Sequence, residues 1–435
     1  MTATTAPEAV LPDGPHNHRL AQSVRFVVSR SGTMRRLRRQ YGSAFTLDTL
    51  NFGRMVMLAD PAEVRELFQT APELADTPDV NLGSVLGRGS FFAITGDEHR
   101  RQRKLLTPPF HGRRLRAYEQ IIESETRRET RSWPEGRPFP VMPSTMRITL
   151  NVILRAVFGA EGAELDELRE LLPRAVKLGS VLAVLPAVRR DLGGFGPGAR
   201  FDKYRHRYDE IVDRLVERAT ADPRLDQRED VLALLVQARY DDGSPMTREQ
   251  IADQLLTLLT AGHETTATTL AWAVERLRRH PDVLERLAAG DDDLLDAAII
   301  EVQRVRPVVE FTARQVRADT LRIGRWTMPR GTVMGACIAL LHEDETLFPD
   351  PARFDPDRFL GSRADTYGWI PFGGGVRRCI GAAFASLEMR VVLRTVLRDF
   401  TIEPTTERAE RRRPRGIAVA PARGGRAVVH RRIMV

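Results

Sequence analysis

The sequence predicts a mostly α-helical protein with a small β part, built as one large fold. The longest helical signal, residues 244–280, has a plausible N-cap region at its start and a His-Pro pair that ends it. Residues 44–60 and 312–340 instead carry alternating and turn-forming residues, which favours short strands. No linker divides the 435 residues convincingly, so we expect a flexible segment over residues 1–20 and a single domain over residues 21–435.

The other elements follow along the chain from periodicity and end signals. Asp60-Pro61 is expected to open a helix directly after the first strands, because proline suits the first helical turn. The Gly- and Pro-rich residues 189–200 are expected to form a flexible link between two helices. Further helices are predicted at residues 97–106, 115–133, 146–159 and 381–400.

Composition limits the classes of protein that fit. The two cysteines, Cys337 and Cys379, cannot build a disulfide framework, which favours a reducing cytoplasm; we expect Cys337 to be a buried small hydrophobe. The N-terminus lacks an apolar signal region, and no stretch approaches the roughly 20 apolar residues that span a bilayer. The net charge of +8 comes almost wholly from arginine, without a nucleic-acid-binding pattern. We therefore expect a cytoplasmic monomer with no membrane anchor and no nucleic-acid partner.

The stretch FGGGVRRCIG, residues 372–381, places a thiol among glycines and arginines. Residues 373–375, all glycine, permit backbone conformations closed to other residues and a close approach to a flat ligand. Gly381 lies where a helix begins, and the positive end of that helix favours a thiolate at Cys379. Arg377 offers a planar fork that suits a carboxylate. The loop therefore fits an iron ligand, while a structural cysteine and a histidine-activated catalytic cysteine remain alternatives.

The spacing Phe372-x-x-Gly375-x-Arg377-x-Cys379-x-Gly381 resembles the haem-binding signature of the cytochrome P450 family. The resemblance implies that family's α-rich triangular prism, with a long central helix over a haem b whose iron is bound by Cys379. It extends over most of the chain, because four further motifs of the family occur in the same order. The residues it places at the cofactor are His99, Arg103, Ala261, Arg314, Phe372, Gly373, Arg377, Cys379 and Gly381.

Residues 261–266, AGHETT, lie midway along the longest predicted helix. Gly262 weakens the helix there, and Thr265 and Thr266 can donate hydrogen bonds to carbonyls of the preceding turn. On its own the stretch is a polar cluster that a helix tolerates. The resemblance implies a catalytic pair in which Glu264 relays protons from solvent and Thr265 holds the oxygen species that receives them.

Two further motifs gain meaning from the resemblance. Glu301 and Arg304 stand three residues apart on a predicted helix, which by itself is an ordinary ion pair. The resemblance adds Arg358, in FDPDRF, and implies a buried network that holds the Cys379 loop in place. His99 and Arg103, one helical turn apart, are implied to reach a haem propionate.

The basic residues near these motifs suggest a partner surface. Arg314 and Arg377 are implied to join His99 and Arg103 at the two propionates. The remaining cations are interpreted as a surface to which an acidic ferredoxin or flavodoxin docks by electrostatic steering. They are Arg100, Arg101, Lys104, Arg113, Arg114 and Arg378.

The resemblance implies a haem-thiolate monooxygenase that inserts one atom of O2 into a C–H bond, by hydroxylation or epoxidation. Electrons would come from NAD(P)H through a reductase and the ferredoxin or flavodoxin. Two alternatives are a peroxide-driven peroxygenase of the same family and a non-catalytic haem sensor. The acid–alcohol pair of Glu264 and Thr265 favours the use of O2 and redox partners over both.

The segments that the motifs leave unspecified are largely aliphatic and favour an apolar substrate, such as a terpenoid, a polyketide or a fatty acyl chain. Glu310 is the exception, and we interpret it as a solvated, outward-facing carboxylate in preference to a substrate contact. The residues expected to line the substrate pocket are Phe91, Phe92, Leu182, Leu185, Leu258, Val308, Val309 and Phe311.

Overall fold

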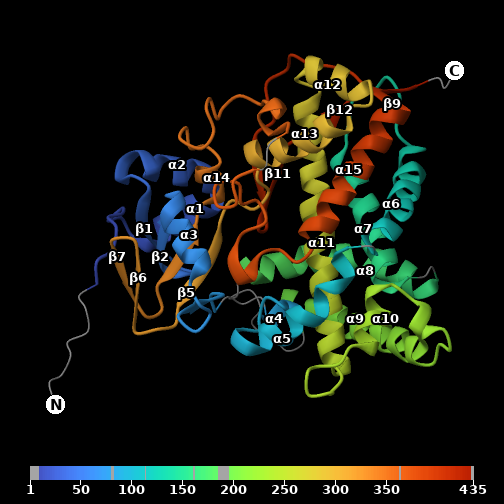
Figure 1. Ribbon diagram of the computed structural model, residues 1–435, viewed down its shortest axis with the longest axis horizontal. Helices are drawn as coiled ribbons and strands as arrows, with labels where there is room; N and C mark the ends of the chain where they lie inside the picture. The colour runs from blue at the N-terminus through green and yellow to red at the C-terminus, as the bar shows by residue number, and fades with distance from the viewer. Residues whose placement is uncertain are drawn as a thin grey trace. The chain divides into compact units, whose positions relative to one another are not determined.

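The computed structural model describes residues 9–79, 83–112, 114–159, 162–184, 195–361 and 364–432 (Figure 1). The chain forms two compact units. The first unit comprises residues 1–80, 300–379 and 417–419, and the second comprises residues 81–299, 380–416 and 420–435. The protein is 54% helical with small sheets, which confirms the predicted mostly α class. The single domain over residues 21–435 stays a prediction.

The first unit is organised on a five-stranded sheet in the order β1-β2-β8-β5-β3. Its strands are β1 Ala44–Thr49, β2 Gly53–Leu58, β3 Ala75–Asp76, β5 Thr312–Val316 and β8 Val333–Ala336. β2 and β8 run parallel, and the other neighbouring pairs are antiparallel. A separate hairpin consists of β6 Thr320–Ile323 and β7 Trp326–Pro329. The helices and 3-10 turns are α1 Arg19–Val28, α2 Arg30–Tyr41, α3 Pro61–Gln69, α14 Ile338–Leu341, η4 Pro356–Phe359 and η5 Gly375–Arg377.

Apolar cores cover both faces of this sheet, which explains why β2 is apolar without alternation. Met55 and Met57 point into a core that includes residues of α1 and α2. Val56 and Leu58, on the opposite face, belong to a core with residues of α3 and the β6–β7 hairpin. Successive side chains of a strand point to opposite faces, so a strand buried on both sides reads as a continuous apolar run.

One predicted boundary in this unit is wrong. Residues 338–340 were expected to continue the strands, yet they form α14. The N–H of Cys337 makes the last bond to the sheet, donating to Leu58 O at 2.8 Å, and the chain then turns into a helix. A short apolar run cannot be assigned to strand or buried helix from periodicity alone. The helix expected at Asp60-Pro61 is present. The Asp60 carboxylate accepts hydrogen bonds from the N–H groups of Ala62 and Glu63 in its first turn.

The second unit is predominantly helical. Its helices and 3-10 turns are α4 Gly83–Leu86, α5 Gly96–Leu106, η1 Pro108–Phe110, α6 Arg114–Thr130, α7 Met142–Phe158, α8 Ala163–Val184, α9 Pro197–Thr220, η3 Leu225–Gln227, α10 Val231–Gln237, α11 Arg248–Leu277, α12 Pro281–Ala288, α13 Asp292–Val305 and α15 Ala382–Asp399. Residues of α13 from 300 onward belong to the first unit. The short strands are β4 Phe139–Pro140, β9 Phe400–Ile402, β10 Arg412–Arg415, β11 Ala418–Pro421, β12 Arg426–Ala427 and β13 Val429–Arg431. Residues 418 and 419 of β11 belong to the first unit. β12 pairs with β4, and β13 with β9.

Helix α11 is the longest element, with α7 and α15 packed against it in the second unit (Figure 1). It begins with a capping box, in which Thr247 and Gln250 each bond the other's backbone N–H. It ends at Leu277, and α12 begins at Pro281, so the predicted start and stop are confirmed. Within the expected link 189–200, residues 189–194 lie outside the described part of the chain, and α9 already begins at Pro197.

Candidate functional site

Cys379 lies at the end of a loop that is held by hydrogen bonds within its own backbone. Its N–H donates to Phe372 O at 2.9 Å, and the Arg378 N–H donates to Gly375 O at 3.0 Å. The Phe372 ring packs edge-on against Trp369, with ring centroids 6.1 Å apart. The Cys379 thiol is exposed, and α15 begins three residues later. The loop therefore presents the sulfur to its surroundings on a well-bonded backbone.

The glycines of this loop are needed for a close approach to α3. Gly373 and Gly375 have φ values of +66° and +64°, which other residues rarely adopt. A Cβ on Gly374 would lie 2.1 Å from the Phe68 ring, and one on Gly375 would lie 2.1 Å from Phe68 O. A close approach was expected, but the described contact is with Phe68. The position of Gly381 is open, since a Cβ there would meet nothing within 4 Å.

Two buried arginines lie close to the loop, and one of them binds a carboxylate. Arg377 Nη2 lies 2.7 Å from Asp76 Oδ1, and both side chains are almost fully buried. Arg314 donates to the carbonyl of Gly374 at 3.1 Å and to no carboxylate in the described part of the chain. Burial, with the neighbouring Arg377 charge, lowers the Arg314 pKa to about 10. This cluster keeps a surplus of positive charge, which fits the carboxylates of a porphyrin. Asp76 carried no signal in the sequence.

Glu301 and Arg304 form a bidentate ion pair with no exposed side-chain surface. Arg304 Nε lies 2.6 Å from Glu301 Oε2, and Nη2 lies 2.7 Å from Oε1. Arg358 reaches the same carboxylate, with its Nε 3.4 Å from Oε1. The structure thus brings the three residues together as one network. Arg304 also donates to the backbone carbonyls of His342, Pro351 and Arg353.

His342 extends this network to the cysteine loop, a role that the sequence did not indicate. The Ile370 N–H donates to His342 Nε2 at 3.0 Å, so the imidazole proton is on Nδ1, which lies 3.2 Å from Arg304 O. Burial, and then the Arg304 charge, lower the His342 pKa to about 3. A neutral imidazole therefore joins Arg304 to Ile370, two residues before Phe372.

The threonines of the AGHETT stretch bond back along α11, as the sequence predicts. Thr265 Oγ1 donates to Ala261 O at 2.8 Å, and Thr266 Oγ1 donates to Gly262 O at 3.0 Å. The helix remains continuous through residues 261–266. Hydroxyl bonds of this kind compete with the helical ladder and can loosen it.

The neighbouring α7 fixes the same stretch from one side. Thr149 Oγ1 donates to His263 O at 3.0 Å, and Thr145 Oγ1 donates to Ala267 O at 2.9 Å. A Cβ on Gly262 would lie 3.3 Å from Ile153 Cδ1, so glycine permits the close packing of the two helices. These contacts define the rotation of α11 at the acid–alcohol pair.

The Glu264 carboxylate is held in an ion pair that the sequence did not reveal. Arg415, at the end of β10, places its Nε 2.6 Å from Glu264 Oε1. The Glu264 side chain is 16% exposed and that of Arg415 is 51% exposed, so water reaches the pair. The adjacent His263 is buried and its Nδ1 lies 2.8 Å from Leu259 O; burial lowers its pKa. Arg415 stands in an arginine-rich run that gave no positional signal.

On α5, His99 and Arg103 both face Phe91. The His99 ring is buried, and its centroid lies 4.3 Å from that of Phe91. The Arg103 guanidinium lies 5.8 Å from the same ring. Phe91 was expected in the substrate pocket, and its described contacts are with these two basic residues; Phe92 is 39% exposed.

The basic surface expected around α5 is largely neutralised. Arg101 pairs with Asp242 at 2.9 Å, Lys104 pairs with Asp241 at 2.5 Å, and Arg100 pairs with Asp97. The Arg113 residue and the Arg114 side chain lie outside the described residues, and Arg378 is exposed. Composition counts charges without their partners, so the sequence overstated the positive field here.

The remaining residues expected in the pocket have varied surroundings. Leu182, Leu258 and Val308 are buried, and Val309 packs against the α3 side of the sheet core. Leu185 lies outside the described residues. The Phe311 ring contacts Phe26 and Phe52, with centroids 5.6 and 6.1 Å apart.

The interpretation of Glu310 as a solvated carboxylate is wrong. Its exposed fraction is 1%, and it accepts a hydrogen bond from Ser31 Oγ at the start of α2. The charges of Arg30 and Arg35 lie near enough to act on it. Glu310 is placed among cations of α2, which no short-range pattern could show.

Comparisons with known proteins agree on one family. The family model described as cytochrome P450 matches residues 12–425. Cytochrome P450 138 of Mycobacterium bovis and of Mycobacterium tuberculosis is 52% identical over 437 residues, covering 99% of both chains. Cytochrome P450 135B1 of Mycobacterium bovis is 39% identical over 96% of this chain and 90% of that one.

Solved structures match at the level of the fold. The retinoic acid-bound cyanobacterial CYP120A1 has a TM-score of 0.85 at 23% identity, covering 98% of this chain and 100% of that one. The CYP102L1 structure has a TM-score of 0.81 at 24% identity, with the same coverage. In the described ranges, no group of three His, Cys, Asp or Glu residues could hold a metal ion. No described helix is long and apolar enough to cross a bilayer.

Proposed function

Since this chain belongs to the cytochrome P450 family and is a P450 monooxygenase, we propose that it oxidises an apolar small molecule at a C–H bond, by hydroxylation or epoxidation. The observation that carries this proposal is the loop of Cys379 with its buried, positively charged neighbours Arg314 and Arg377. An exposed thiol beside surplus buried charge fits a cofactor that brings both a metal and carboxylates.

The cofactor proposed is haem b, with Cys379 as the sole protein ligand of its iron among the motif residues. Arg314 and Arg377 would hold propionates, and His99 and Arg103 are proposed to do the same. Bound haem would supply the activation of O2, which thiolate donation favours. The glycines at 373–375 would keep the backbone of the loop in the conformation that Phe68 requires.

Glu264 and Thr265 are the residues proposed to move protons. Glu264 pairs with Arg415 and is accessible to water, so it can exchange protons with solvent. The hydroxyl of Thr265 donates to Ala261 O in this structure and could instead turn to donate its proton where bound haem would activate O2.

The buried network of Glu301, Arg304 and Arg358 is proposed to position the loop and to take no part in the reaction. Glu301 and Arg304 have no exposed side-chain surface, Arg358 is 13% exposed, and the network reaches Ile370 through His342. Side chains that hold a ligand in place from behind in this way limit the movement of that ligand. Replacing these residues is therefore expected to weaken haem retention more than it slows the reaction of the protein that retains haem.

The substrate class proposed is apolar, such as a terpenoid, a polyketide or a fatty acyl chain. Leu258 on α11 and Leu182 on α8 are buried aliphatic side chains in helices of the second unit, which supports an apolar lining. Electrons are proposed to come from NAD(P)H through a reductase and a ferredoxin or flavodoxin in the cytoplasm. The ion pairs of Arg101 and Lys104 predict that steering by this surface is weak.

The proposed reaction is tested by isotope labelling. The holoprotein is supplied with NADPH, a ferredoxin and its reductase, ¹⁸O2, and a panel of terpenoid, polyketide and fatty acyl compounds. We expect a product that carries one ¹⁸O atom. Product formation with hydrogen peroxide alone, and none with the redox partners, would instead indicate a peroxygenase. Haem binding without product in either arm would contradict an enzymatic role on these substrate classes.

A further inference from the structure

Helix α1 carries an apolar face that points away from the protein. Leu20, Val24, Val27 and Val28 recur at helical spacing and are 44–68% exposed. This spacing places them on one side of the helix, while the buried Gln22 and Phe26 occupy the other. A helix that is already packed through Phe26 needs no second apolar face for folding. The outward face therefore requires another explanation.

The adjoining turn between β1 and β2 extends this apolar face. Leu50 lies in that turn and is 52% exposed. The Leu50 N–H donates a hydrogen bond to Ser23 Oγ of α1 at 2.9 Å, which holds the turn against the helix. Leu20, Val24, Val27, Val28 and Leu50 together form a surface that we name the α1 patch. Contiguous exposed apolar surface of this kind commonly marks an interaction site.

The chain around the α1 patch is one-sided in charge. Residues 14–47 contain seven arginines and no acidic residue, and Asp13 and Asp48 flank this stretch. Arg35 and Arg38 of α2 pair with Glu343 and Asp344. Arg25, Arg36 and Arg39 are exposed and have no carboxylate partner within the described ranges. Arg25 lies on α1 itself, and Arg36 and Arg39 lie on the following helix α2. Exposed arginines on the same helices as exposed aliphatic side chains fit a surface that is both apolar and negatively charged.

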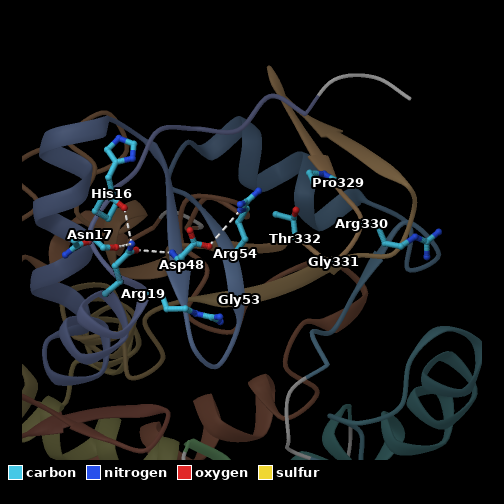
Figure 2. A pocket seen from close by; sticks show the side chains of 12 residues that line it. His16, Asn17, Arg19, Asp48, Gly53, Arg54, Pro329, Arg330, Gly331 and Thr332 are labelled. Carbon is cyan, nitrogen blue, oxygen red and sulfur yellow. Dashed lines mark hydrogen bonds and ion pairs between the residues drawn. The ribbon is translucent and has the colours of Figure 1, made fainter. Parts of the chain in front are cut away.

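A polar pocket of about 680 Å³ opens beside the first turn of α1. Figure 2 shows side chains from the N-terminal segment, the β1–β2 ribbon and the loop between β7 and β8 around it. His16, Arg19, Arg54 and Arg330 line it, and Asp48 is its acidic residue. Arg54 Nε lies 3.9 Å from Asp48 Oδ1, a distance too long for a strong pair. Arg330 already pairs with Asp319, with its Nη2 2.9 Å from Asp319 Oδ1, so Arg19 and Arg54 are the arginines that the pocket offers to a phosphate.

We propose that the α1 patch and this pocket form a binding surface for a bilayer of anionic phospholipids. The aliphatic side chains would enter the interface, the exposed arginines would meet the negative surface, and the pocket would take a phosphate headgroup. A second copy of this chain fits less well, because two identical arginine-rich faces would repel each other. Such binding is reversible and differs from a spanning anchor.

Vesicle flotation of the full-length holoprotein tests the proposal. Vesicles of phosphatidylcholine with about one-third phosphatidylglycerol are compared with vesicles of phosphatidylcholine alone. We expect flotation with the anionic vesicles, reduced by high salt and absent with the neutral ones. The double variant Val24→Asp/Val28→Asp should bind about tenfold more weakly or not at all, because both side chains would carry charge into the interface.

The matched control is Leu74→Asp. Leu74 is 43% exposed and directly precedes β3, at the opposite edge of the five-stranded sheet from β1. This variant should bind like the wild type, and all three proteins should show the same haem spectrum. Equal binding by the double variant, or no flotation of the wild type, would overturn the proposal. A wild-type dimer that the double variant loses, without flotation, would assign the patch to a second copy instead.

Discussion

The Nε atom of Arg415 lies 2.6 Å from Oε1 of Glu264, although the two residues are 151 positions apart. The pair connects the end of β10 to the acid of the AGHETT stretch. Because both partners are reached by water, it contributes only about 0–1 kcal/mol to stability. Its consequence is instead the orientation of the Glu264 carboxylate.

Replacing the acid should slow catalysis without affecting the fold. We expect Glu264→Gln to lower kcat roughly 100-fold, because an amide cannot relay protons. The kinetic solvent isotope effect should rise in parallel, while haem content and the melting temperature stay unchanged. Glu403→Gln, at a half-exposed carboxylate that pairs with His430, is the control. An unchanged kcat in Glu264→Gln would remove this residue from the mechanism.

Arg415 allows the orientation of Glu264 to be tested separately. We expect Arg415→Gln to lower the amount of product formed per NAD(P)H consumed, because the Glu264 carboxylate loses its partner on β10. Arg415→Lys should restore much of that fraction if charge is sufficient to hold the carboxylate. Identical product yields per NAD(P)H in wild type and both variants would show that the ion pair has no influence on turnover.

The buried network should govern stability. Arg304→Met leaves the Glu301 carboxylate buried without its bidentate partner, which should cost about 3–5 kcal/mol in the free energy of unfolding. Urea denaturation followed by circular dichroism measures this loss. Arg317→Met breaks a pair whose Asp79 partner is 72% exposed, and it should cost no more than about 1 kcal/mol. Equal losses in the two variants would contradict the structural role of the network.

His342 should make stability fall in mild acid. Its folded-state pKa of about 3 lies below the ordinary value of 6.5, so between these pH values the unfolded chain binds a proton that the folded protein does not. Its contribution is complete above pH 6.5 and is lost as the pH falls, by up to about 1.4 kcal/mol per pH unit. Urea titrations between about pH 5 and pH 7.5 measure this slope.

The variant His342→Gln isolates that contribution. Its unfolding free energy should depend less on pH than that of the wild type, by up to about one proton between pH 5 and pH 7.5. A wild-type slope in His342→Gln would mean that the buried imidazole does not titrate as described.

Arg314 should hold the cofactor. Arg314→Met removes a buried cation without a carboxylate partner in the described chain, and haem loss to apomyoglobin should accelerate about 10- to 100-fold. Arg322→Met, at an exposed arginine of β6, should lose haem at the wild-type rate. If the two variants lost haem equally slowly, the propionate role of Arg314 would be wrong.

Local signals in the sequence predicted much of the fold. The capping residues of α11, the Asp60 cap of α3 and the β1–β2 strands all follow from short-range chemistry, and the structure contains them. The short helix α14 was not predicted, because a run of four apolar residues is too short to show a helical or strand periodicity. The sequence also predicted the hydrogen bonds from the hydroxyls of Thr265 and Thr266 to carbonyls of the preceding helical turn.

The ion-pair and hydrogen-bond partners of the functional residues could not be predicted from the sequence. Asp76 meets Arg377 from a two-residue strand, and Arg415 meets Glu264 across 151 positions. His342 joins Arg304 to Ile370 only because the fold buries all three. Glu310 looked solvated for the same reason, since the sequence could not show α2 covering it. Long-range pairing, and burial that depends on it, is what a single sequence lacks.

The bond between the Cys379 sulfur and haem iron is the central claim, and the carbon monoxide complex of the reduced protein tests it most directly. We predict that the dithionite-reduced wild type with carbon monoxide shows the strongly red-shifted Soret band of a thiolate-bound haem. Cys379→Ser should lose that band, while Cys337→Ser, at the buried second cysteine, should keep it. A wild type without the red-shifted band, or a Cys379→Ser variant that retains it, would contradict the account.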